Sequence, residues 1–394
     1  MKVLHICGAC FYKENMGYQE NLLPKMHKKL GYETHIVAMA QISSDDGTFK
    51  YAEYDYINDV GIPVHIIKYK KFQLNLLNRL AVILKVYDDL YKKIDEISPD
   101  IIFVHGGQFY SIRDVREYVK ENKNVKLFID QHMDYYNEPK NSKLMKLVNM
   151  FFGFELRKIS GVVQKFWGTT PWRCQYLKDV YKLPQEKIGL LVMGGDDEKI
   201  PFNEASNIRN KVRESLNIEK DDFVLITGGR IDITKNIHLL MDAVIRINNP
   251  KLKLIIFGNT FDDVKKYIEA GSKHKSIRYI GWIPSEDSYK YFLSSDLVAF
   301  PGTHSVLWEQ ACACGVPGVF NDWGGMHHVD LGGNCQFIDG NDIEAMKSVI
   351  NDIVSNHIKY EKMKKIAQDM GIPQFSYLNI AKKAIGIEGE QEHY

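Results

Sequence analysis

The chain has 394 residues, of which 45% are hydrophobic and 26% are charged, as in an ordinary soluble globular protein. Its length suggests two domains, and its composition excludes collagen-like, disordered and disulfide-scaffold proteins. Fifty-one Lys and Arg against fifty Asp and Glu leave a formal charge of +1, so no nucleic-acid partner is expected. Six cysteines in a chain this long fit a reducing cytoplasm, and no apolar run approaches the ~20 residues of a membrane span.

In the first half of the chain, short apolar runs alternate with segments of helical period, which is typical of a parallel sheet wrapped by helices. Strands are predicted near Val3–Cys7, Thr34–Ala38, Pro63–Ile67, Ile101–Val104, Val125–Ile129 and Gly161–Gln164. Helices are predicted near Glu20–Leu30, Leu76–Ile97, Ile112–Glu121 and Ser142–Lys158. The helix near Leu76–Ile97 carries one broad apolar stripe, so we expect it to pack on the sheet along most of its length.

A polar stretch over 203–222 predicts a linker and a surface helix, with a domain boundary between about 196 and 220. The strand and helix alternation then restarts. Strands are predicted near Phe223–Thr227, Leu252–Phe257, Ile277–Ile280, Leu297–Phe300 and Gly318–Phe320. Helices are predicted near Asn236–Ile247, Phe261–Gly271, Asp287–Leu293, Val306–Cys314 and Ile343–Ser355. Two doubly wound α/β halves are therefore expected, with a ligand beyond the carboxyl ends of the strands.

A glycine turn with two cations follows the strand at Phe223–Thr227. In Thr227–Asn236, the glycines permit close backbone approach, while Arg230 and Lys235 can bring two positive charges onto one diphosphate. The alternative is a strand-to-helix turn with Thr234 as a helix cap and two solvated cations.

A second motif spans Phe300–Pro317, where a strand ends in a glycine-containing loop and a helix. Thr303 or Ser305 can cap this helix, whose first amides would attract a phosphate. Glu309 is placed to accept hydrogen bonds from a vicinal diol such as a ribose. The alternative is that Glu309 is simply an exposed helix residue.

Together the two motifs resemble the donor-binding domain of glycosyltransferase family 4. The resemblance extends to the N-terminal half through Cys7–Cys10, Gly17–Leu23, Gly31–Val37 and Phe128–Asp134, and to Gly194–Asp196 between the halves. It implies the α/β GT-B fold, with two Rossmann-like doubly wound domains facing across a cleft. Residues 1–200 would bind the acceptor and residues 201–394 the nucleotide-sugar donor, and a final helix near 374–388 would pack back on the first domain.

The resemblance also implies roles for individual residues. Arg230 and Lys235 would bind the diphosphate, and Glu309 the nucleotide ribose. His132 would lie near the reacting centre and the acceptor, although a histidine after a strand is often structural. The rest of the donor site would be Gly229, Gly302, Thr303, His304, Ser305 and Val306, and further acceptor contacts would be Gly17 and His105.

No Asp-x-Asp occurs in the chain, so no metal and no cofactor beyond the nucleotide sugar are expected. An Arg–Lys pair and helix amides can stabilise a leaving diphosphate without a metal. The family usually carries a second glutamate eight residues before the first, and Pro301 stands there in this chain. His304 is a candidate substitute for that side chain.

The expected function is transfer of a sugar, with retention at the anomeric carbon, from a UDP- or GDP-linked donor to a saccharide or lipid-linked acceptor in polysaccharide or glycoconjugate biosynthesis. A GT-B-fold nucleotide-sugar epimerase and a non-catalytic nucleotide-sugar binder are the alternatives. Basic residues within 68–93, together with Phe72, Leu74 and Leu77, could contact the anionic inner face of a membrane peripherally. The alternative there is a sheet-covering helix with solvated ends.

Overall fold

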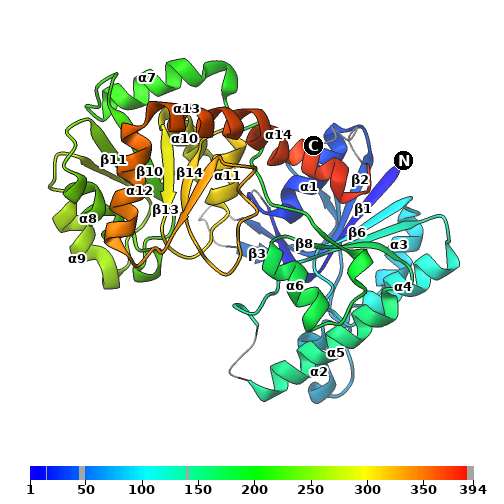
Figure 1. Ribbon diagram of the computed structural model, residues 1–394. Helices are drawn as coiled ribbons and strands as arrows, with labels where there is room; N and C mark the ends of the chain where they lie inside the picture. Colours follow the sequence, from blue (N-terminus) through cyan, green and yellow to red (C-terminus); the bar gives the residue numbers. More distant parts are fainter. Residues whose placement is uncertain (15, 44–48, 139–141, 388–394) are drawn as a thin grey trace. The chain divides into compact units, whose positions relative to one another are not determined.

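The computed structural model describes residues 1–14, 16–43, 49–138 and 142–387, which form two compact units (Figure 1). The N-terminal unit holds Met1–Val192 and the chain from Tyr377 onward, and the C-terminal unit holds Met193–Ser376. The division falls slightly before the expected boundary because residues 195 and 196 already bond to the C-terminal unit. The amide of Gly195 donates to Phe375 O at 2.9 Å, and that of Asp196 donates to Tyr289 Oη at 3.0 Å.

The N-terminal unit is built on one sheet in the order β4-β5-β2-β1-β6-β7-β8-β9, with β3 added to β2. All pairings are parallel except those of β3 and β4, which are antiparallel. The run from β5 to β8 has the strand order of a doubly wound nucleotide-binding fold. The strands are β1 (Lys2–Lys13), β2 (Glu33–Ser43), β3 (Phe49–Tyr51), β4 (Tyr56–Ile57), β5 (Pro63–Ile66), β6 (Ile101–Val104), β7 (Lys126–Gln131), β8 (Val163–Gly168) and β9 (Ile188–Leu190).

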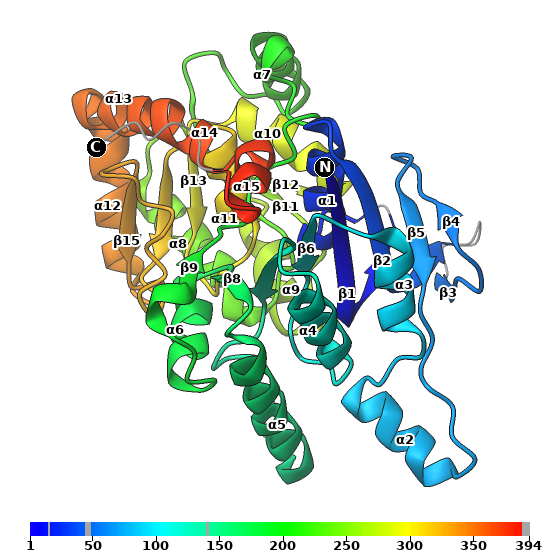
Figure 2. The same ribbon diagram turned by 90° about the vertical axis from the view of Figure 1, so that its right-hand side faces the viewer.

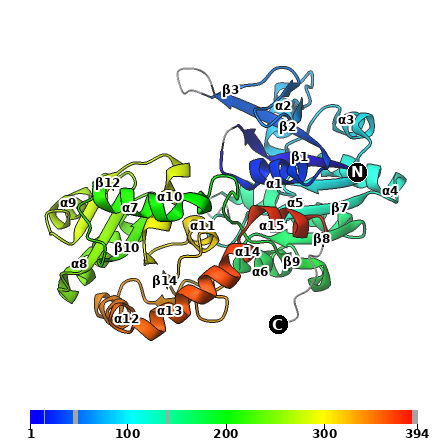
Figure 3. The same cartoon turned by 90° about the horizontal axis from the view of Figure 1, so that it is seen from above.

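Most helices of this unit cover the sheet, and the central strands β6 and β7 are buried at successive positions rather than at alternate ones. They are α1 (Gln19–Lys29), α2 (Asn75–Leu84), α3 (Leu90–Ile97), α4 (Ile112–Glu121), α5 (Lys143–Ile159), α6 (Pro171–Asp179) and α15 (Tyr377–Ala384). The last of these, α15, lies beside α1 (Figure 3). Trp167 of β8 donates its indole N–H to Ala384 O at 3.0 Å, which ties the end of α15 to the sheet.

The segment 76–97 differs from the single buried helix predicted from its apolar stripe. It forms two helices, α2 and α3, because Lys85 and Asp89 both adopt left-handed backbone conformations between them. The residues of α3 that follow the stripe are buried, whereas in α2 only Ala81 is buried. The prediction that this segment packs on the sheet along most of its length is therefore wrong for α2.

The C-terminal unit has a six-stranded, wholly parallel sheet in the order β12-β11-β10-β13-β14-β15. This is again the strand order of a doubly wound nucleotide-binding fold, so the loops after β10 and β13 flank the point where the winding direction changes. The strands are β10 (Phe223–Gly228), β11 (Leu252–Phe257), β12 (Ile277–Gly281), β13 (Leu297–Phe300), β14 (Gly318–Asn321) and β15 (Cys335–Ile338).

One face of this sheet is covered by α8, α9 and α12, whose apolar side chains join those of the strands in a single core. The helices of the unit are α7 (Ala205–Ser215), α8 (Ile237–Ile247), α9 (Asp262–Gly271), α10 (Ser288–Ser294), α11 (Leu307–Ala313), α12 (Ile343–Ser355), α13 (His357–Ile366) and α14 (Ile372–Gln374). Within the described ranges, none of the chain's helices has the length and apolar character needed to span a bilayer.

Candidate functional site

The glycine turn after β10 depends on close contact between two loops of the C-terminal unit. Gly229 has φ +102°, and a Cβ on Gly258 would lie 1.8 Å from Gly229 O. A Cβ on Gly228 would likewise lie 2.5 Å from Phe257 O. Side chains at these positions would push apart the ends of β10 and β11, which explains the glycines in Thr227–Asn236.

Arg230 extends from this turn and is largely exposed. Its Nε atom lies 2.9 Å from Asp232 Oδ2, and its guanidinium lies 4.4 Å from the ring centre of Phe261. Asp232 also caps the short helix Ile233–Lys235 by accepting from Thr234 N at 3.1 Å. The cap of this turn is therefore Asp232 rather than Thr234.

Lys235 links the turn after β10 to the loop after β13. Its ammonium donates to Thr303 O at 2.8 Å and to His304 O at 3.3 Å. Gly302 makes this approach possible, because a Cβ there would lie 2.3 Å from Lys235 Cα. Burial lowers the pKa of Lys235, although the charge of Asp232 opposes that shift. The two predicted motifs thus meet at one end of the sheet.

The loop 301–306 leads into α11, which begins at Leu307. Its cap position is Val306, and neither Thr303 nor Ser305 caps it in the expected way. Ser305 Oγ accepts only a long hydrogen bond from Leu307 N, at 3.4 Å. Neither Thr303 nor Ser305 therefore occupies the cap position, Ser305 contributes one long bond to the first residue of the helix, and the helix begins one residue later than predicted.

Glu309 lies in the first turn of α11 and is fully buried, so it is not an exposed helix residue. Its Oε1 atom accepts from His304 Nε2 and from His328 Nε2, each at 2.8 Å. Its Oε2 atom has no hydrogen-bond partner among the described residues. Glu309 therefore has one oxygen fixed by two imidazoles and a second oxygen with unused acceptor capacity.

The two imidazoles also set the charge of Glu309. Burial alone would raise the pKa of its carboxyl group, but the charge and hydrogen bonds of His304 and His328 hold that pKa well below its usual value. Carboxylates that accept several hydrogen bonds remain ionised in this way. The site therefore presents an anionic acceptor rather than a neutral carboxylic acid.

His304, Glu309 and His328 are also a residue set that could hold a metal, since their ligand atoms all lie within 4.8 Å of one another. A tetrahedral zinc ion with bonds near 2.0 Å separates its ligand atoms by about 3.3 Å. Both imidazole nitrogens instead lie 2.8 Å from the same oxygen atom, which is the separation of hydrogen bonds. The present geometry fits a hydrogen-bonded clamp on Glu309 better than a metal site.

In the N-terminal unit, polar side chains gather where β6 and β7 end. Asp130 of β7 is fully buried and lies 3.2 Å from His105 Nδ1 and 3.3 Å from His132 Nε2. The amide of Gly106 donates to the other carboxylate oxygen of Asp130 at 2.8 Å. Burial opposes ionisation of Asp130, but the two histidines lower its pKa, so the carboxylate stays charged.

His132 and His105 occupy different environments beside this carboxylate. The side chain of His132 is 39% exposed, whereas that of His105 is 1% exposed. Both ring nitrogens of His105 lie within hydrogen-bond distance of buried side chains, His5 and Asp130. The expectation of a direct acceptor contact through His105 is therefore corrected, because His105 lies behind Asp130 in the core.

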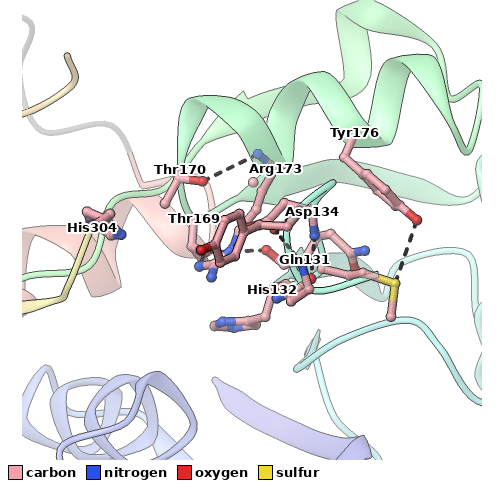
Figure 4. A network of polar contacts seen from close by, with 12 residues as sticks. Gln131, His132, Asp134, Thr169, Thr170, Arg173, Tyr176 and His304 are labelled. Atoms are coloured by element: carbon pink, nitrogen blue, oxygen red, sulfur yellow. Dashed lines mark hydrogen bonds and ion pairs between the residues drawn. The ribbon is translucent and has the colours of Figure 1, made fainter. Parts of the chain in front are cut away.

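Arg173 is a further cation near His132, and sequence reasoning missed it. Its Nε atom donates to Asp134 Oδ2 at 3.3 Å, and its Nη1 atom donates to Thr169 Oγ1 (Figure 4). It belongs to α6, whose start is marked by the cap residue Thr170 and by Pro171. A Thr-Pro pair at a helix start is a readable signal for this helix.

The structure thus brings the predicted donor residues of the C-terminal unit together around Lys235 and Glu309, with Arg230 paired to Asp232. In the N-terminal unit, His132 lies on Asp130, while Gly17 is exposed just before α1. Asp130 also belongs to one of these clusters, although it was not predicted as a site residue. His328 belongs to the other, and from the sequence it is expected only as part of a donor-side loop over Trp323–His328 or as a surface histidine. Their roles depend on contacts with Glu309 and with His105 and His132 that spacing in the chain does not reveal.

Comparison with known proteins places these clusters in context. Residues 208–370 match the family described as glycosyl transferases group 1. The chain is 23% identical over 357 residues to the lipopolysaccharide 1,2-N-acetylglucosaminetransferase of Salmonella typhimurium, covering 84% of this chain and 85% of that protein. It is also 23% identical over 159 residues to an uncharacterized glycosyltransferase of Methanocaldococcus jannaschii, covering 38% of this chain and 40% of that protein.

Solved structures share the fold at low sequence identity. A glycosyltransferase from Rickettsia africae has a TM-score of 0.70 at 16% identity, over 98% of this chain and 97% of that one. HepE of Anabaena in complex with UDP has a TM-score of 0.66 at 16% identity, over 97% of this chain and 98% of that one. The UDP-GlcNAc 2-epimerase of Neisseria meningitidis has a TM-score of 0.60 at 14% identity, over 98% of this chain and 99% of that one.

The fold is common to transferases and epimerases, so the choice between them depends on the sequence matches. The family match covers most of the C-terminal unit and includes Arg230, Lys235 and Glu309, and both curated relatives are glycosyltransferases. With two Rossmann-like units and this family match, the chain is a glycosyltransferase of the GT-B fold whose residues 208–370 match the group 1 glycosyl transferases.

Proposed function

We propose that this glycosyltransferase moves a sugar from a nucleoside diphosphate sugar to a saccharide or lipid-linked acceptor, with retention and without a metal ion. The observation that carries the proposal is the bond from Lys235 to the loop that leads to Glu309. It holds a cation and an anionic acceptor at the same end of one parallel sheet, where such sheets bind nucleotides.

The two charges suit the two polar parts of a nucleoside diphosphate. Lys235 and Arg230 would bind the diphosphate, and Glu309 Oε2 would accept hydrogen bonds from the ribose hydroxyls. A UDP- or GDP-linked donor is favoured, and the presence of UDP in the HepE complex supports the uridine nucleotide. Pro301 offers no carboxylate to the donor sugar, and His304 is bonded to Glu309, so we assign His304 to holding Glu309.

The negative charge that develops on the departing diphosphate contributes most to the activation barrier that the protein can lower in such a transfer. Fixed cations lower it by stabilising charge that develops as the glycosidic bond breaks. Lys235 is held by main-chain oxygens before any ligand binds, so little reorganisation is required of it. Retention follows from the resemblance to family 4, with the acceptor attacking on the face that the diphosphate leaves.

The acceptor side of the proposal depends on an apolar surface of the N-terminal unit, here called the α2–α5 surface. Large apolar side chains on α2, on α5 and just before α2 are more than one third exposed: Phe72, Leu74, Leu76, Leu77, Leu80, Val82, Leu144, Met145, Leu147, Met150 and Phe154. Both helices project from the same end of the unit (Figures 1 and 2). Burying one such side chain is worth about 1.5–3 kcal/mol, so this surface favours an apolar partner.

The charges around the α2–α5 surface indicate which apolar partner fits. Within Asn75–Leu84 and Lys143–Ile159 the only acidic residue is Glu155, which is buried against Arg113. The exposed charges of the helices and of the preceding strand connection are basic: Lys68, Lys70, Lys71, Arg79, Lys143, Lys146, Arg157 and Lys158. We therefore propose that an anionic bilayer covers this surface, which places the enzyme at the inner membrane face near lipid-linked acceptors.

A thermal-shift screen against UDP, GDP, CDP and ADP tests the donor assignment, since a ligand that binds the native state raises the unfolding midpoint. We expect one nucleotide to stabilise the protein more than the other three. Epimerisation is the rival reaction, because the fold is shared with a UDP-GlcNAc 2-epimerase. Incubation of the nucleotide sugar without acceptor separates the two, since an epimerase then yields an isomeric nucleotide sugar and a transferase does not.

A further inference from the structure

Three buried histidines of the N-terminal unit form one continuous chain of polar contacts. His27 Nε2 lies 2.8 Å from Ala381 O, and His27 Nδ1 lies 2.8 Å from His5 Nε2. His5 Nδ1 lies 3.0 Å from His105 Nε2, and His105 Nδ1 lies 3.2 Å from Asp130 Oδ2. The three rings and the carboxylate are each at most 1% exposed, so water does not supply missing hydrogens.

The number of hydrogens that this row of contacts requires follows from the chemistry of its two ends. Ala381 O is a carbonyl oxygen and ionised Asp130 is a carboxylate, so both ends only accept hydrogen bonds. Four contacts need four hydrogens, whereas three neutral imidazoles supply three. One contact would be left as two facing lone pairs, which is costly in a buried site.

We propose that His5, His27 and His105 share one additional proton that balances the charge of Asp130, and that this chain is a positioning network for His132. The proton belongs on His105, because that ring lies beside the negative charge of Asp130, and the contacts then run as donors from His105 toward both Asp130 and His5. Burial lowers the pKa of His5 and lowers that of His27 to about 4, which keeps these two rings neutral.

The network reaches His132 through Asp130. The Nε2–H group of His132 donates to the same carboxylate oxygen that faces His105, so the lone pair of a neutral His132 lies on Nδ1. Because the proton on His105 already balances the charge of Asp130, the carboxylate orients the His132 ring but attracts a second proton to that ring only weakly. The other charged groups that act on His132 are Arg173 of α6, which lowers its pKa, and Glu20 of α1, which raises it.

The proposal goes beyond the proposed function, and its first test uses no donor or acceptor. Imidazole ¹⁵N–¹H spectra of the full chain at pH 8 should show one buried histidine with hydrogens on both nitrogens. Removing His5 leaves two imidazoles and two contacts, so no additional proton is needed. The signal of the doubly protonated ring should therefore disappear in His5→Phe. His27→Leu should give the same loss if His5→Phe does not fold.

The control is His35→Phe, because His35 and His65 form a more exposed pair at the same 3.0 Å separation in this unit. This variant should leave the doubly protonated buried signal in place. The second readout is the titration of His132, whose midpoint should rise by about one pH unit in His5→Phe, since the neighbouring positive charge is lost. Three singly protonated buried rings in the wild type, or a His132 midpoint that stays unchanged in folded His5→Phe, would overturn the proposal.

Discussion

His328 donates to Glu309 across 2.8 Å in the core of the C-terminal unit, while the adjacent His327 pairs with exposed Asp322 at the same distance. Removing His328 leaves the buried carboxylate with one imidazole donor instead of two. We expect His328→Ala to lower the free energy of unfolding by roughly 1.5–3 kcal/mol, the value of a hydrogen bond to a charged group.

Denaturant unfolding measures this change, and His327→Ala is the matched control. An exposed ion pair contributes at most about 1 kcal/mol, so the control should unfold almost as the wild type does. Equal losses of unfolding free energy in the two variants would mean that burial does not increase the contribution of the His328–Glu309 hydrogen bond to stability.

Replacing Glu309 with glutamine tests its role toward the nucleotide. The glutamine side chain keeps the shape and an acceptor for the imidazoles, but its amide nitrogen cannot accept a hydrogen bond from a ribose hydroxyl. We expect Glu309→Gln to weaken binding of the stabilising nucleoside diphosphate about tenfold or more, consistent with roughly 1.5–3 kcal/mol per charge-assisted bond. Calorimetric titration of the folded variant gives the affinity, and an unchanged value would remove Glu309 from the donor site.

Introducing negative charge on the α2–α5 surface tests membrane contact. Leu76 and Leu80 are 69% and 40% exposed, so glutamates should be tolerated there in solution. We expect the double variant Leu76→Glu, Leu80→Glu to lose flotation with vesicles of phosphatidylglycerol and phosphatidylcholine, whereas the wild type floats and is released by salt.

Ile358→Glu is the control for this surface, since Ile358 is 84% exposed on α13 of the C-terminal unit. It should float as the wild type does. A wild-type protein that stays with the soluble fraction at low salt would contradict the membrane assignment.

Acid should destabilise the N-terminal unit well before its carboxylates titrate. Burial lowers the pKa of His27 to about 4 and that of His5 as well, so the folded state excludes protons that the unfolded chain binds below about pH 6.5. Stability is therefore present above pH 6.5 and is lost as the pH falls toward 4, by roughly 3 kcal/mol from His27 alone.

Urea unfolding at pH 7.5, 5.5 and 4.5 measures this dependence. His27→Leu should be less stable than the wild type at pH 7.5 but should lose less stability on acidification. A wild-type midpoint that is constant over this range would show that neither buried histidine is kept neutral by folding.

The sequence predicted the strands well where apolar runs were short and bounded by turns, as at Ile101–Val104 and Leu297–Phe300. It failed for 76–97, because an apolar stripe predicts an apolar face without saying whether protein covers that face. The break at Lys85 and Asp89 was also not predictable, since both residues adopt left-handed conformations although neither is a glycine.

The candidate site was predictable where both partners lie in recognisable motifs, as for Lys235 and the loop 301–306. His328 is nineteen residues from Glu309, and no local pattern joins them. His5 carried a readable signal, because a histidine among Val3, Leu4 and Ile6 must find a buried partner. The partner itself, His27 on α1, follows only from the packing of the helix on β1.

Calorimetric titration of UDP and GDP into wild type, Lys235→Ala and Lys251→Ala tests the central claim most directly, namely that the end of the C-terminal sheet binds a nucleoside diphosphate. Lys251 is the control because it pairs with Asp221 at the opposite ends of the strands. The account predicts saturable binding that weakens about tenfold or more in Lys235→Ala and stays unchanged in Lys251→Ala. Failure of the wild type to bind either nucleotide, or equal affinity in Lys235→Ala, would contradict it.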